Sequence, residues 1–191
     1  MTSTSMMNTS TVRSFAAAVA APPPAAAPVV HRLPAGPWSA YYHEPEDETW
    51  TTESYKKLQL CESWEALGSL LRELGPHKTT NGLLRIMCGD YSPLWENNGN
   101  IYGGTYCLKV RRRNAIEVFQ RYLAAAILGS CTENKDNRIV GVTISPKKDS
   151  CIIKIWNLDC RRFSNPTDLK ILHEDIRHEE ILYRKQTDQR M

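Results

Sequence analysis

The sequence predicts an α+β fold, in which a curved, largely antiparallel β-sheet carries about three helices on its convex face. Strand-like and helix-like segments are mixed along the chain, and most connections between successive strands are short. Short connections favour antiparallel pairing, with the helices gathered on one face of the sheet. At 191 residues and without an internal repeat, the chain has the length of about one domain.

The first half of the domain is expected to hold four strands and one helix. Aromatic and branched residues with partial alternation indicate the strands, which we expect at 38–44, 54–60, 82–88 and 105–110. Between the second and third strands, Trp64 and four leucines have helical spacing. This pattern predicts a helix over 63–74 that ends at Gly75 and Pro76.

The second half is expected to hold a helix, a hairpin, another helix and a last strand, at 113–130, 138–145 with 151–158, 165–176 and 179–186. The first of these helices has one apolar face, and Gly129 suits its end. The hairpin strands flank the turn-like stretch Pro-Lys-Lys-Asp-Ser. The next helix is predicted because Asn165 is a good N-cap and Pro166 a good first helical residue.

Residues 1–34 differ in composition from the predicted domain, 35–191. They are rich in Ser and Thr and then in Ala and Pro, so they cannot bury enough surface to offset their ordering entropy, and we expect a disordered tail. The absence of acidic residues before Glu44 faintly resembles an organelle transit peptide. Only two arginines occur in the first 40 residues, however, so a plain flexible tail and a cytoplasmic location are expected.

Composition and motifs indicate a binding protein rather than an enzyme. The net charge of +3 suits an anionic ligand but is too weak for bulk duplex binding, and no apolar run is long enough to span a membrane. The six cysteines form no C-x-x-C pair and no secretory signal is visible, so reduced, buried thiols are expected rather than disulfides. The sequence has no P-loop, no G-x-S-x-G motif and no histidines at metal-ligand spacing. We therefore expect no catalysis, no cofactor and no metal.

Three of the five tryptophans lie in turn-like stretches or at the end of a strand, and no core stripe requires Trp50. Trp50 is in an acidic turn region, Trp95 follows the turn-like stretch Gly-Asp-Tyr-Ser-Pro, and Trp156 ends a strand. One interpretation is that each packs against the sheet edge. The other is that Trp50 and Trp95 stack on both faces of a planar base, with a cation–π contribution if the base is charged. Glu96 beside Trp95 would then accept from a base edge with two N–H donors, as in 7-methylguanine.

Basic residues near these tryptophans suit the phosphates of such a ligand. Lys147 and Lys148 lie at the expected hairpin turn, and Lys154 is on its second strand. They act as point charges toward phosphate, although a solvated hairpin tip is the plainer interpretation. A second basic run over 109–114 opens a helix, where the dipole disfavours cations, so RNA or protein contact is an alternative to a solvated surface.

These segments resemble the eukaryotic translation initiation factor 4E family of mRNA cap-binding proteins. Residues 36–186 match in order and spacing, including PWSAYYHEPEDETW, SPLWENNGNIYGGTYCLKV and GVTISPKKDSCIIKIW. The resemblance implies that Trp50 and Trp95 stack on the cap and that the backbone N–H of Trp95 reaches the guanine carbonyl. It also implies that Glu96 pairs with the ring N–H and exocyclic amine, and that Trp156 lies beside the methyl group.

Several positions depart from the family pattern. An arginine that braces the glutamate in the family is Thr105 here, and the phosphate-contacting arginine matches Lys147. The lysine that follows it on the strand matches Ile152, which leaves that contact to Lys148 or Lys154. The sequence also ends soon after the match, without the family's long final loop over the phosphates. These departures predict weaker or altered cap binding.

The resemblance further implies a protein partner, a 4G-type scaffold or a 4E-binding protein. The positions aligned with the family's partner surface are Glu65, Arg121, Tyr122 and Ala125, with Trp64 one place before the family tryptophan. Because these residues differ from the family's, we expect a non-standard surface. A compact chain this divergent is similar to the small isoforms of protozoan parasites such as trypanosomatids.

The expected function is binding of the 7-methylguanosine cap of mRNA in translation initiation, by a monomer within a complex and without membrane contact. The alternative is a divergent protein-interaction module or translational repressor with weak cap affinity. Thr105, Ile152 and the short carboxyl terminus favour the alternative.

Overall fold

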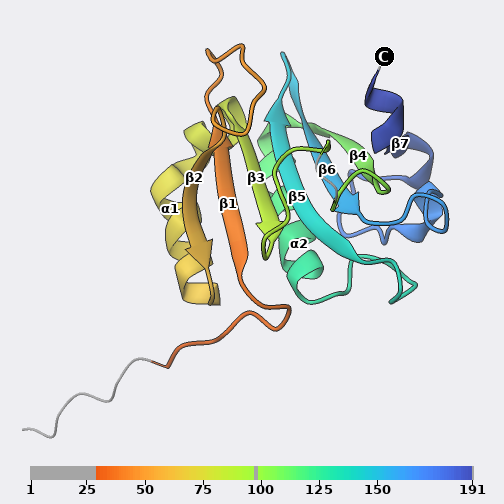
Figure 1. Ribbon diagram of the computed structural model, residues 1–191, viewed down its shortest axis with the longest axis horizontal. Coiled ribbons are helices and arrows are strands. Elements are labelled where there is room, and N and C mark those ends of the chain that lie inside the picture. The colour runs from red at the N-terminus through yellow and green to blue at the C-terminus, as the bar shows by residue number, and fades with distance from the viewer. Residues whose placement is uncertain (1–28, 97–98, 191) are drawn as a thin grey trace, which may run out of the picture.

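The computed structural model describes residues 29–96 and 99–190, which form one seven-stranded antiparallel sheet (Figure 1). The strand order is β2-β1-β3-β5-β6-β4-β7. The strands are β1 (Trp38–His43), β2 (Lys56–Cys61), β3 (Leu83–Cys88), β4 (Gly104–Arg111), β5 (Ile139–Pro146), β6 (Ser150–Asn157) and β7 (Leu182–Lys185). Each strand lies within one of the predicted segments or shifted from it by a residue or two, and β5 and β6 form the predicted hairpin. The predicted fold class is confirmed.

Two helices, α1 (Trp64–Asn81) and α2 (Ala115–Ile127), lie side by side behind the sheet in Figure 1. The amphipathic helix α2 packs on β5 and β6, and its Phe119 and Leu123 are buried against the sheet. Gly129 follows α2 with a φ of 62°, the left-handed conformation expected where a helix ends. Both helices therefore leave the opposite face of the sheet uncovered.

The first helix differs from its predicted end. Gly75 breaks the helical path with a φ of 64°, but Pro76 opens a second helical segment that continues to Asn81. Proline is tolerated in the first turn of a helix, where its missing N–H has no intrahelical partner. The hydroxyls of Thr79 and Thr80 donate back to the carbonyls of Gly75 and Pro76. The Gly-Pro pair is thus a kink rather than a stop.

The predicted third helix over 165–176 is wrong. Asn165 does cap a turn, but this turn is a single 3-10 turn over Pro166–Asp168. Leu169 is fully buried in an extended conformation and pairs with Thr132. Burial of this leucine against the core outweighs the local helical preference, so the structure has two α-helices in its described residues rather than about three.

Strict alternation along the central strands separates the core from the open face. Leu84, Ile86, Val142, Ile144, Ile153 and Ile155 are fully buried on the helix side. The residues between them point to the uncovered side of the sheet because successive side chains in a strand alternate between its faces. Arg85, Thr143 and Lys154 occupy these positions in three adjacent strands. The polar side chains of the sheet are therefore gathered on one face.

The ends of the chain and the cysteines complete the fold. Residues 1–28 of the predicted tail lie outside the described residues, whereas Leu33 near its end is buried and its N–H donates to the Glu62 carbonyl.

All six cysteines are free and buried, as expected. Burial raises the pKa of the Cys131 thiol to about 12, so this thiol stays protonated. No helix in the described part of the chain is long and apolar enough to cross a membrane.

Candidate functional site

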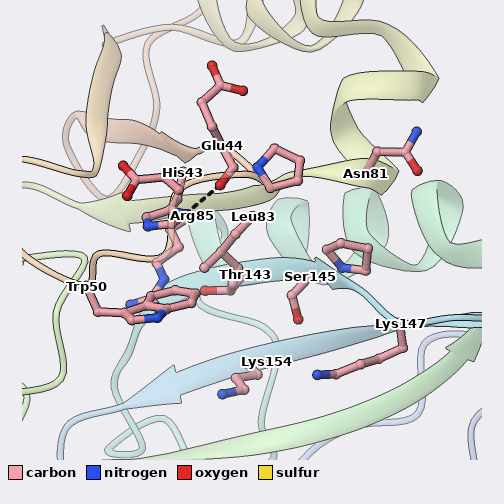
Figure 2. Close-up of a pocket in the computed structure, with 13 residues that line it drawn as sticks. His43, Glu44, Trp50, Asn81, Leu83, Arg85, Thr143, Ser145, Lys147 and Lys154 are labelled. Atoms are coloured by element: carbon pink, nitrogen blue, oxygen red, sulfur yellow. Dashed lines mark hydrogen bonds between the residues drawn. The ribbon is translucent and has the colours of Figure 1, made fainter.

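The open face of the sheet carries a cavity of about 340 Å³ at the end of β1, β3 and β5 (Figure 2). Its walls come from the 44–50 loop, from the alternate positions of β3, β5 and β6, and from the β5–β6 turn. The aromatic, basic and hydroxyl-bearing residues in its lining include His43, Trp50, Arg85, Thr143, Lys147 and Lys154. An aromatic ring, a guanidinium and two ammonium groups thus border one hollow.

Trp50 is held with one ring face covered. Its indole stacks on the imidazole of His43, with ring centroids 4.4 Å apart and an interplanar angle of 5°. His43 is buried, and its ring nitrogens lie 2.9 Å and 2.7 Å from the carbonyl oxygens of Glu44 and Thr49. These contacts fix the imidazole, which in turn fixes the indole. Because Trp50 is still 62% exposed, its outer face is free to stack on a planar ligand.

Trp156 lies under the cavity wall with Arg85 above it. The indole is buried, and its Nε1 donates to the Thr143 hydroxyl over 2.9 Å. The guanidinium carbon of Arg85 lies 5.1 Å from the Trp156 ring centroid and 4.7 Å from that of Tyr55. Two aromatic faces therefore flank one cation, an arrangement that favours a positively charged side chain with little water around it.

The predicted phosphate lysines are partly brought together. Lys147 and Lys154 line the cavity, whereas Lys148 lies in a neighbouring hollow at the tip of the β5–β6 hairpin. Burial lowers the pKa of Lys154, and the positive charges of Arg85, Arg184 and Lys147 lower it further. These four positive charges repel one another, and a bound anion would offset the repulsion. The cluster therefore favours anion binding.

The predicted stacking residue Trp95 and its neighbour Glu96 come from the loop between β3 and β4. Trp95 is partly buried against the core and does not line the cavity with Trp50. Glu96 is exposed. Burial lowers the pKa of Arg85 and raises that of Tyr55, and the negative charge of Glu96 opposes the first shift and adds to the second. The carboxylate is therefore near the same face of the sheet as the cavity.

Asn100 shapes this loop from within. Its side-chain amide is buried and donates to the carbonyls of Ser92 and Leu94 over 2.9 Å and 2.7 Å. The backbone carbonyl of Asn100 accepts from the Gly103 N–H. Both bonds are partly buried and tie the backbone on either side of Pro93 to Asn100, so the loop conformation before Trp95 depends on this one side chain.

We expect Asn100→Ala to lower the free energy of unfolding by about 1–3 kcal/mol, because two partly buried carbonyls lose their donor. Thermal unfolding followed by circular dichroism measures this change. Asn134→Ala is the matched control: its exposed side chain accepts one bond, from the Asp136 N–H. If the two variants melt at the same temperature, Asn100 does not hold the loop.

The residues predicted to contact a protein partner lie on α1 and α2, away from the cavity. Glu65 binds His31, with its Oε1 2.6 Å from Nδ1, and this hydrogen bond lowers the pKa of Glu65 to about 2. Arg121 is exposed and paired with Glu117, and Trp64 is half-buried at the start of α1. In contrast, Tyr122 is fully buried with its hydroxyl donating to the Lys170 carbonyl, and Ala125 is buried as well. Those two residues belong to the core of the free chain.

Three residues of the site were missed from sequence: His43, Tyr55 and Arg85. The only available signal was Arg85, a charged residue within the apolar strand Leu-Leu-Arg-Ile-Met-Cys. Such a residue is either on the solvated face of a sheet or buried with a partner. Strand register decides between these, and register could not be read from the sequence.

Comparison with known proteins assigns the chain to a family. A family model described as eukaryotic initiation factor 4E matches residues 35–189. Eukaryotic translation initiation factor 4E of Candida glabrata is 24% identical over 130 residues, which cover 64% of this chain. The match spans 61% of the length of that relative.

Solved structures share the fold. The complex of C. elegans eIF4E-3 with the 4E-binding protein Mextli and cap analog has a TM-score of 0.69 and 17% identity, covering 84% of this chain and 95% of that chain. Ascaris suum eIF4E-3 with m7G cap has a TM-score of 0.57 and 18% identity, covering 69% and 75%. Schistosome eIF4E complexed with m7GpppA and 4E-BP has a TM-score of 0.59 and 22% identity, covering 69% and 74%. With the family match over most of its length and this shared fold, the chain belongs to the eukaryotic initiation factor 4E family.

Proposed function

We propose that this protein binds the 7-methylguanosine cap of mRNA and acts in translation initiation as a binding protein, not an enzyme. The observation that carries the proposal is the cavity itself, which joins the free face of Trp50 to the ammonium groups of Lys147 and Lys154. A charged purine would stack on the indole, and its phosphates would lie against the lysines. The resolved relatives that bind cap analogues support the same ligand class.

The remaining predicted residues complete the proposed site. Trp95 does not line the cavity of the free chain, but in the complex it would cover the second face of the base. Glu96 would accept from the two N–H donors of the base, since a carboxylate offers only acceptors. Trp156 would form the floor beside the methyl group. Lys148, at the hairpin tip, would meet phosphates or nucleotides farther along the RNA rather than the base.

A titration of 7-methylguanosine triphosphate against guanosine triphosphate, followed by tryptophan fluorescence, tests the proposal. The methylated nucleotide carries a positive charge on its base, which adds about 0.5–2 kcal/mol for each indole face that it contacts. We therefore expect the methylated form to bind about tenfold more tightly or better. Equal affinity for both, or no binding of either, would contradict cap recognition and favour the alternative of a protein-interaction module.

The protein partner is proposed to be a 4G-type scaffold or a 4E-binding protein. Relatives of the same fold have been solved with Mextli and with 4E-BP, which supports this class of partner. The exposed candidates on the helix face are Glu65, Arg121 and the half-buried Trp64. These positions differ from the family pattern, so the proposed surface is a non-standard one.

A further inference from the structure

Thr105 cannot hold Glu96 in place, although the family resemblance puts a bracing arginine at this position. The side chain of Thr105 is fully buried, and its hydroxyl lies 3.5 Å from the sulfur of Cys107. Thr105 is also too short to reach a carboxylate on a separate loop. In the sheet it pairs with Trp156 on β6, so the missing arginine would have started beside this tryptophan.

Arg85 reaches the same tryptophan from the other side. It starts on β3, where it pairs with Thr143 of β5, and Thr143 in turn pairs with Lys154 of β6. From there its guanidinium extends over the ring of Trp156, 5.1 Å from the centroid. The guanidinium of Arg85, on β3, thus lies over Trp156, the residue that pairs with Thr105.

Two nitrogen donors of Arg85 have no acceptor within the described ranges of the chain. Among the described residues, its Nε and Nη1 are buried and have no hydrogen-bond partner. Burying a charge and its N–H groups without an acceptor is costly, so such a group in a native protein points to a ligand or to a partner that arrives with one. Tyr55 cannot neutralise the cation, because burial raises the pKa of its hydroxyl and keeps it protonated.

Glu96 is the carboxylate whose charge acts on Arg85. Burial lowers the pKa of the Arg85 guanidinium, and the negative charge of Glu96 opposes this effect. Since the buried Nε and Nη1 have no partner, Glu96 does not yet accept from them. Its side chain is exposed, so it has not given up its hydration to another buried partner.

We propose that Arg85 is the positioning residue for Glu96. It takes the role of the arginine that the family has at position 105, where this chain has Thr105. This inference rests on the proposed function. A carboxylate has about four lone-pair sites, so Glu96 can accept from the guanidinium and from both N–H donors of a guanine edge at once. The fork of the guanidinium fixes the plane of the carboxylate as well as its charge. Arg85 then acts on the ligand through Glu96 and defines which base edge is accepted.

A comparison of 7-methylguanosine triphosphate with 7-methylinosine triphosphate tests this role. The inosine analogue keeps the charge and the ring N–H but lacks the exocyclic amine, so the ratio of the two affinities measures the contact with Glu96. We expect Arg85→Met to lower this ratio by about fivefold or more, because hydrogen bonds to a charged, well-held acceptor are the stronger ones. Arg85→Lys keeps the charge without the fork, and we expect a ratio between those of wild type and Arg85→Met.

Lys147→Met is the matched control, since it removes a cation from the same cavity. It should weaken both analogues equally and leave their ratio unchanged. In a Glu96→Ala background, Arg85→Met should produce no further change in the ratio. If Arg85→Met and Arg85→Lys weaken both analogues equally, Arg85 is a phosphate or packing residue and the inference is overturned. If wild type binds neither nucleotide, the proposed function itself fails, which is a different result.

Discussion

Replacing Trp50 with alanine is expected to weaken binding of 7-methylguanosine triphosphate by about 30- to 150-fold. The variant removes one of the two proposed stacking faces, and base stacking with a cation–π contribution amounts to about 2–3 kcal/mol. The fold should be unaffected, because the indole is 62% exposed and packs at the surface against the rings of His43 and Tyr55. Isothermal titration calorimetry measures the change without relying on the fluorescence of the deleted residue.

Tyr102→Ala is the control for this experiment. Tyr102 is 65% exposed, similar to Trp50, and its ring contacts the guanidinium of Arg161 outside the cavity. We expect this variant to bind the cap analogue as wild type does, with both variants unfolding near the wild-type temperature. An equal effect of the two substitutions, or no effect of Trp50→Ala, would show that the base does not stack on Trp50.

The strands could be predicted from sequence because their determinants are local. Aromatic and branched residues in partial alternation mark each strand, and Pro-Lys-Lys-Asp-Ser marks the β5–β6 hairpin, so all of these elements were found. The segment after Asn165 was not, because its cap is local but its continuation is not. Leu169 pairs with Thr132, a contact across more than thirty residues of sequence that no local pattern reveals.

In the candidate site, too, some residues could be predicted from local sequence and others depend on long-range pairing. Trp50 and the lysines of the hairpin could be proposed from residue type and position, since a loop tryptophan and a basic turn are visible in sequence. The stacking of His43 on Trp50 depends on the path of the 44–50 loop, and the placement of Arg85 depends on the register of β3 against β5. Both are products of long-range pairing. Arg85, which we propose takes the role of the arginine expected at position 105, could therefore not be identified from the sequence of its strand.

Asn157, at the end of β6, connects the neighbouring strands β4 and β7 to two loops. Its Oδ1 accepts from the Gly104 N–H over 3.1 Å and from the Tyr183 hydroxyl over 2.8 Å. Its Nδ2 donates to Asn137 Oδ1 over 3.1 Å and to the Phe163 carbonyl over 2.8 Å. The side chain is buried, so every partner depends on it. One amide thus joins the start of β4, strand β7 and two loops.

The backbone of Asn157 explains the glycine pair that ends the Trp95 loop. A Cβ on Gly103 would lie 1.9 Å from the Asn157 carbonyl oxygen, and one on Gly104 would lie 2.2 Å from the Tyr183 hydroxyl. Only glycine permits this close approach. Burial also raises the pKa of Tyr183, so its hydroxyl stays protonated as the donor to Asn157. The loop that carries Trp95 and Glu96 is therefore anchored at its end by the Asn157 network.

Asn157→Ala is accordingly expected to lower the free energy of unfolding by about 3–5 kcal/mol, because a buried network loses its central member and its partners stay buried without bonds. For a domain of this size the melting temperature should fall by about 6–20 °C. Urea denaturation and calorimetry measure both quantities. Asn165→Ala is the matched control, since this exposed asparagine caps one short turn and its loss should cost about 1 kcal/mol. If Asn157→Ala costs no more than Asn165→Ala, the side-chain hydrogen bonds of Asn157 do not hold this edge of the sheet together, and the anchor of the Trp95 loop must lie elsewhere.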